Sequence, residues 1–361
     1  MTSSIRGFLP VALAVAAFAG GLLWWSARRE AARDALLAEP GATGGGPSSY
    51  TAKAPPGDAV PRTAADWKAR LVWLPREQAV EAIRAELASG RDAKTGLGFK
   101  IGQGGALAEA PSLRVLLLDE LARLDPAAAG EMARSILAAK TSPDEWAVAL
   151  RNLARVTNDE AGRAFLEGKM RELLTHEPWQ REASEGFLEA FDVAVHLGGT
   201  GLLPELTALV RKSDNRAASH AAYLALDRLT IANTAMILTK LADEPDLMTG
   251  REATRANYFA RADAGDAAQR GVLEKYLLDA QRTAEELRTF AGLYPNANFM
   301  LSQNLLTTVT TPERAALVAR DQAALRVVNE WLADPRFAAR RESLEQMRAR
   351  LEKFVRQAAN P

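Results

Sequence analysis

Apolar residues recur at intervals of three and four along most of the chain. The offsets from the first residue are 0, 3, 4 and 7 in three separate stretches, which begin at Trp146, Phe187 and Ala222. This spacing is that of one buried stripe on an α-helix, which has 3.6 residues per turn. The pattern therefore predicts an all-α chain.

The apolar stripes also repeat at a longer interval. Successive stripes end at Leu87, Leu121, Leu153, Ala194 and Leu229. The intervals between these residues are 34, 32, 41 and 35 residues, which is typical of a helix pair in a solenoid. Because one helix pair cannot cover its own apolar face, we expect α-helical hairpin repeats that stack over residues 64–361. The looser pattern beyond Leu241 leaves open a subdivision near 242–250.

Several helix starts are marked by a proline that follows Ser, Thr or Asp. These pairs are Asp125-Pro126, Ser142-Pro143, Thr311-Pro312 and Asp334-Pro335. Proline suits the first helical position, and the preceding side chain can cap the next free N–H. Glu145, three residues after Ser142, is expected to complete a capping box by accepting from the backbone of Ser142.

One stretch resembles a known repeat family. Residues 214–229 read DNRAASHAAYLALDRL, with an A-x-x-A-L-x-x-L core that ends at Leu229. This core resembles the second helix of a HEAT-type repeat, although Ala218-Ser219 stands where that family has Val-Arg. The resemblance extends over Gln78 to Leu241. It implies a HEAT-like solenoid and a role as a scaffold or in binding protein partners.

The N-terminal residues predict a membrane anchor. No charged residue occurs from Gly7 to Ala27. At ~1.5 Å per residue this segment spans about 31 Å, the thickness of a bilayer's hydrocarbon core. We expect a tail of residues 1–6, a transmembrane helix over 7–27, and a juxtamembrane segment and Gly/Pro-rich linker over 28–63. Ala17-Phe18-Ala19 also fits a signal-peptidase site, so a cleaved signal is the alternative.

The anchor predicts a single-pass protein of a bacterial-type inner membrane. Basic residues just after the anchor, including Arg28 and Arg29, favour a cytoplasmic body. A very short tail before the first apolar run instead favours an extracytoplasmic body, which is the orientation we expect.

Composition excludes several classes of chemistry. The chain has no cysteine, which excludes disulfides, Cys-ligated zinc and iron–sulfur clusters. Lys plus Arg and Asp plus Glu number 45 each, so the net charge is zero. A neutral chain without a basic tract gives no reason to expect nucleic-acid binding.

Only one group of residues could hold a metal. Asp192 and His196 are four positions apart, so they share a helix face, and His220 lies in the next predicted repeat. The three residues are candidate ligands for a metal-dependent enzyme, but no recognised metal motif accompanies them. We therefore expect no cofactor and no catalytic activity.

Residues 95–111 interrupt the helical pattern with five glycines. Their arrangement matches neither the dinucleotide fingerprint nor the phosphate-binding loop. Within this loop Phe99, Lys100 and Ile101 are compatible with an extended strand and are candidate partner contacts.

These features predict a membrane-anchored helical-repeat scaffold or adaptor that binds a protein partner. A membrane-tethered chaperone is an alternative, because an anchor, a linker and a helical body also describe lipase-specific foldases. Those proteins carry an R-x-x-F-D-Y-type motif. Here Phe191-Asp192 matches that motif, but Leu188 replaces its Arg and Val193 its Tyr.

Overall fold

The computed structural model describes residues 63–212 and 215–359. These residues are mostly helical and include one two-stranded sheet, so the all-α prediction is confirmed. The predicted anchor at 7–27 lies outside the described residues. None of the described helices combines the length and the apolar character needed to cross a bilayer.

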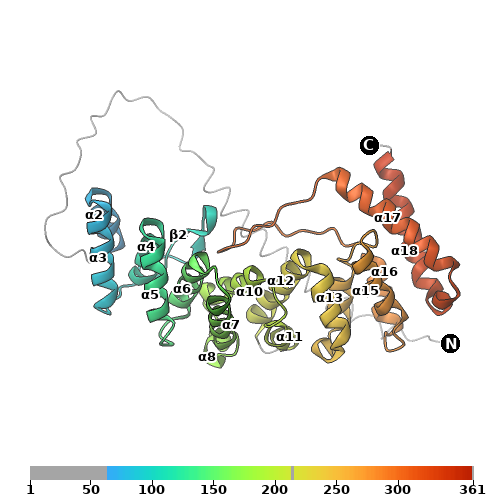
Figure 1. The fold of residues 1–361 in the computed structure, drawn as a ribbon, viewed down its shortest axis with the longest axis horizontal. Coiled ribbons are helices and arrows are strands. Elements are labelled where there is room, and N and C mark those ends of the chain that lie inside the picture. Colours follow the sequence, from blue (N-terminus) through green and yellow to red (C-terminus); the bar gives the residue numbers. More distant parts are fainter. Residues whose placement is uncertain (1–62, 213–214, 360–361) are drawn as a thin grey trace, which may run out of the picture. The chain divides into compact units, whose positions relative to one another are not determined.

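Helices follow one another along the chain, and most connections between them are short; the exceptions join α3 to α4 and α16 to α17 (Figure 1). The first are α2 (Ala64–Trp73), α3 (Arg76–Ala88), α4 (Leu113–Leu124), α5 (Pro126–Ile136), α6 (Pro143–Val156), α7 (Glu160–Leu174), α8 (Glu177–Arg181) and α9 (Glu185–Glu189). They are followed by α10 (Phe191–Leu197), α11 (Leu203–Arg211), α12 (Arg216–Ala232), α13 (Thr234–Asp243) and α14 (Glu252–Phe259). The last are α15 (Ala267–Leu278), α16 (Ala284–Leu293), α17 (Arg314–Ala333) and α18 (Arg341–Ala359). Three 3₁₀ turns lie at η1 (Gln103–Gly105), η2 (Pro245–Met248) and η3 (Pro335–Arg340).

Each helix packs mainly on helices that are close to it in sequence. Helix α4 contacts α3, α5 and α6, and α12 contacts α10, α11 and α13. Helix α16 packs on α14 and α18, and α17 packs on α18. The predicted stripe residues, including Trp146, Phe187 and Ala222, are fully buried. Packing between sequence neighbours, with an apolar stripe inside, is compatible with a helical repeat architecture.

The predicted helix caps are largely confirmed. Asp125 and Ser142 accept hydrogen bonds from backbone N–H groups at 3.0 and 3.3 Å at the starts of α5 and α6. The start predicted at Thr311-Pro312 is wrong by two residues, because α17 begins at Arg314 without a side-chain cap.

The glycine-rich residues 95–111 form a short hairpin. Strand β1 (Lys100–Ile101) pairs antiparallel with β2 (Leu107–Glu109), so the extended run predicted around Lys100 is confirmed. The intervening turn has positive φ angles of 66° at Gly104 and 75° at Gly105, which glycine adopts without strain. We call Gly104 and Gly105 the glycine turn.

A long extended segment, the strap, connects α16 to α17 over residues 295–313. It leaves α16, reaches back towards β2 and α10, and returns to α17 (Figure 1). Near its far end, Gln303 and Thr308 face each other in an antiparallel bridge. We call the residues between them, 304–307, the strap tip. Loops of more than about 12–15 residues without secondary structure are uncommon in compact domains, and they are usually either functional or linker segments.

Candidate functional site

The strap tip is held by a buried carboxylate from a distant part of the chain. Asp192 on α10 has no solvent-exposed surface. Its Oδ2 accepts hydrogen bonds from the backbone N–H groups of Leu306 at 2.7 Å and Thr307 at 2.9 Å. Its Oδ1 accepts a further hydrogen bond from the Thr307 hydroxyl. Three donors of the strap tip thus converge on one side chain more than 110 residues away in sequence.

An arginine of the next helix pair compensates the charge of Asp192. The Nη1 of Arg228 on α12 lies 3.3 Å from Asp192 Oδ1. A buried carboxylate is costly unless it is paired and hydrogen-bonded. Asp192 meets both conditions, but only when the strap tip is in place does it receive all four contacts.

The other side of the strap tip lies against the glycine turn. Arg155 on α6 donates from Nη2 to the carbonyls of Gly104 at 2.7 Å and Leu305 at 3.4 Å. A Cβ at Gly105 would lie 2.1 Å from the carbonyl oxygen of Leu305. Only glycine therefore permits this approach. The Leu305 side chain is fully buried.

The glycine turn is itself fixed to the helices beneath it. Arg151, which is fully buried, donates from Nη1 to the carbonyl of Gly105 at 2.6 Å and contacts Asp119 Oδ1 at the same distance. Asp119 Oδ2 accepts from the backbone N–H of Leu107 at 3.0 Å. Burial lowers the pKa of the Arg155 guanidinium, and the nearby charge of Arg151 lowers it further.

These contacts define the junction, which comprises the glycine turn, Arg155, Asp192 and Arg228. It brings together the hairpin, α6, α10 and α12, and it binds an extended stretch of chain. The junction forms hydrogen bonds with two backbone N–H groups, one carbonyl and one hydroxyl of that stretch. One leucine side chain of the stretch is buried. The arrangement is suited to binding a polypeptide and offers no exposed nucleophile.

Arg228 belongs to a series of ion pairs that join successive helix pairs. Asp227, its neighbour in sequence, pairs in the other direction with Arg261 at 2.8 and 2.9 Å. The paired residues are 36 positions apart for Asp192 and Arg228 and 34 apart for Asp227 and Arg261. These separations match the interval predicted from the apolar stripes.

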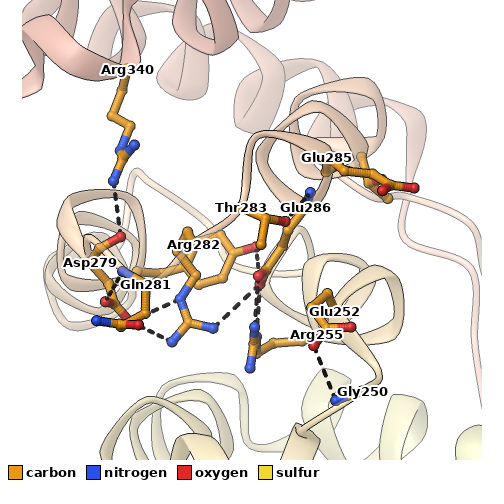
Figure 2. Close-up of polar contacts among 12 residues, drawn as sticks. Gly250, Glu252, Arg255, Asp279, Gln281, Arg282, Thr283, Glu285, Glu286 and Arg340 are labelled. Atoms are coloured by element: carbon orange, nitrogen blue, oxygen red, sulfur yellow. Dashed lines mark hydrogen bonds and ion pairs between the residues drawn. The ribbon is translucent and has the colours of Figure 1, made fainter.

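A second buried polar cluster lies between α14, α15 and α16 (Figure 2). Arg255 binds both carboxylate oxygens of Glu286 at 2.7 Å, and the hydroxyl of Tyr276 donates to Glu286 at 2.9 Å. Arg282 lies between Glu286 and Asp279. Burial and the charge of Glu286 raise the pKa of Tyr276 well above its usual value. Two arginines balance two carboxylates here, so the cluster stabilises the packing of these helices.

The candidate metal ligands do not form a metal site. Asp192 is occupied by the strap tip and Arg228, and His196 is exposed. His220 stacks on Tyr223 with the ring centroids 6.2 Å apart. Among the described residues, no group of three His, Asp or Glu side chains could hold a metal ion.

The candidate partner contacts in the hairpin are divided between core and surface. Phe99 is 5% exposed, and its backbone N–H donates to Glu185 at 2.8 Å. Lys100 is exposed and lies 3.3 Å from Glu109, while Ile101 packs partly buried against the core. Of the three residues, only Lys100 is exposed.

The fold and the junction define an all-α protein whose helices hold an extended segment of their own chain. No protein-family model matches the sequence, and comparisons with curated proteins and with solved structures find no match. The junction was missed by sequence reasoning. Its one local signal is a long segment without apolar periodicity, bounded by Pro295 and Pro312 and interrupted by Leu305-Leu306.

Proposed function

We propose that this protein is a membrane-anchored helical-repeat scaffold or adaptor that binds a protein partner through an extended segment of that partner. The observation that supports this is the junction, where Arg155 on α6 and the buried Asp192 on α10 hold an extended stretch by its backbone. Any extended polypeptide has backbone N–H and carbonyl groups that can make such contacts. The ion pairs at intervals of 34 and 36 residues support a HEAT-like solenoid as the frame.

In this proposal, the apolar segment at 7–27 is the membrane anchor and residues 28–63 are a tether. The body lies on the extracytoplasmic side. The charge-free length of this segment supports a single membrane span. Removing residues 1–27 is expected to move the protein from the membrane pellet to the soluble fraction. Reporter fusions after residue 63 then test the orientation, and a cytoplasmic reporter signal would contradict it.

The partner is tested by in-cell crosslinking of the full chain, followed by purification from membranes. We expect one protein to be recovered in near-stoichiometric amount, to capture this chain in the reciprocal experiment, and to bind it again when both are purified. If crosslinked membranes yield only substoichiometric species that do not rebind, the scaffold function is wrong.

A further inference from the structure

The contacts of the strap tip prescribe which polypeptide can occupy the junction. Asp192 takes two successive backbone N–H groups and the hydroxyl of Thr307. Two positions before that hydroxyl, the Leu305 side chain is fully buried and its carbonyl accepts from Arg155. Leu306, between them, is partly buried against the core. The pattern that fits is therefore leucine, an apolar residue, then threonine or serine, in an extended conformation.

The strap is fixed at its start by Asn296, which is 4% exposed and donates its backbone N–H to the carbonyl of Ala260 at 2.7 Å, but the residues next to the tip are exposed. Gln303 and Thr308, which flank the tip, are exposed, and Leu301 is 62% exposed. The strap is also not needed to span a distance between α16 and α17, because both helices pack on α18. The excursion thus places four residues in the junction and returns, as expected of a tethered ligand.

We propose that the junction is a recognition site for a partner segment of the pattern Leu-x-Thr or Leu-x-Ser, in which x is apolar, and that the strap tip occupies this site until such a segment displaces it. The proposal rests on the proposed function and specifies its binding site. Displacement leaves Asp192 with the same number of hydrogen bonds, because the incoming segment supplies the same donors.

Tethering sets a quantitative condition on this exchange. A segment on a short flexible linker has an effective concentration on the order of 1 mM at its site. A free peptide with the strap's own sequence and an intrinsic dissociation constant K must compete with that concentration, so its apparent constant is K plus the effective concentration. The intact chain should thus bind this peptide no more tightly than ~1 mM, and a chain with the strap tip disabled should bind it with K.

The test uses the full chain in detergent and a fluorescent peptide of residues 299–311. In the release variant, Leu305→Ala and Thr307→Val are combined in the protein. We expect this variant to bind the peptide at least ~tenfold more tightly than the intact chain in fluorescence anisotropy. Equal affinity of both chains, or no binding to a release variant with unchanged helix content, would overturn the proposal.

Two neighbouring threonines provide a matched control in the peptide. The Thr307→Val peptide should bind the release variant about tenfold or more weakly, because it loses a hydrogen bond to a charged group. The Thr308→Val peptide, changed at an exposed position, should bind as the parent does. Equal binding of the two altered peptides would show that Asp192 does not read the hydroxyl, and would overturn the proposal.

A measurement on the unmodified chain guards against a misfolded variant. Excess peptide should accelerate hydrogen exchange at the backbone N–H groups of Leu306 and Thr307, since the strap tip is displaced, and leave exchange within α6 unchanged. Unaltered exchange at saturating peptide would overturn the proposal. Concentration-dependent dimers with exchanged straps would also overturn it, by making a second copy the occupant.

The two proposals fail in distinguishable ways. A crosslinked partner whose binding is unaffected by the release variant would leave the scaffold function standing and remove the junction as its site. If peptide binding behaves as expected but membranes yield no stoichiometric partner, the junction stands as a peptide-binding site and the scaffold function is wrong.

Discussion

Gly105 carries the closest backbone contact of the junction. Its φ of 75° and the 2.1 Å distance from an added Cβ to the carbonyl of Leu305 are two separate reasons why a side chain is not tolerated. Gly104 has a similar φ of 66°, but nothing lies within 4 Å of its added Cβ. Gly104 thus has only the conformational requirement for glycine, whereas Gly105 has both that requirement and the contact with the strap.

Gly105→Ala is expected to release the strap tip, whereas Gly104→Ala is not. Each substitution should cost about 1 kcal/mol of unfolding free energy for the positive φ, and Gly105→Ala should cost more because of the clash. Urea unfolding measures the difference, and hydrogen exchange at Leu306 and Thr307 reports release. Equal costs with equal exchange in both variants would show that the contact at Gly105 is unimportant.

The histidines make stability depend on pH. The chain has three, and burial lowers the pKa of each. Below pH ~6.5 the unfolded chain therefore binds protons that the folded chain does not. The free energy of unfolding thus decreases as the pH decreases in that range. We expect the melting temperature to decrease from pH 7.5 to 5.5.

His220, which is partly buried on Tyr223, should contribute more to this dependence than the exposed His196. His220→Gln is thus expected to flatten the melting temperature between pH 7.5 and 5.5 more than His196→Gln does. A melting temperature that is constant over this range in the parent chain would contradict the assignment.

Individual helices show where local sequence signals are sufficient. Ser142 caps α6 as predicted, because the capping side chain and the N–H it binds are three residues apart. The capping box was wrong, because both oxygens of Glu145 bind Arg114 on α4 at 3.0 Å. A bidentate arginine in a mostly buried interface binds a carboxylate more strongly than a single backbone N–H does. The position of Arg114 in space cannot be read from the residues near Glu145.

Between helices, buried ion pairs should matter far more than exposed ones. Glu286→Gln is expected to cost about 3 kcal/mol of unfolding free energy, because Arg255 stays buried without its counter-charge. Glu345→Gln, which removes the exposed pair with Arg341 on α18, should cost less than about 0.5 kcal/mol. Urea unfolding of both variants measures these costs, and similar values would contradict a structural role for the cluster in Figure 2.

For the molecule as a whole, the strap joins parts that a linear array would leave independent. Arrays of helix pairs contact mainly their neighbours, so distant pairs can unfold separately. The strap tip instead ties the segment after α16 to Asp192 on α10 and Arg155 on α6. It therefore couples the stability of these regions.

Loosening the strap tip is expected to reduce the cooperativity of unfolding. Thr307→Val with Leu305→Ala should broaden or split the urea transition seen by circular dichroism, with a lower slope, whereas Leu301→Ala on the exposed arm should not. A single transition of unchanged slope in the double variant would show that the strap does not couple the two regions.

The sequence by itself determined the all-α class, several helix starts and the interval of about 34 residues. These properties depend on apolar spacing and on contacts three or four residues apart, which are legible locally. The tertiary structure alone decided the roles of Asp192, Glu145 and Gly105. Asp192 was a candidate metal ligand from the sequence, and in the structure it holds the backbone of residues 306 and 307. The reason is physical: a buried charge takes whichever donors the fold brings to it, and here they come from over 110 residues away.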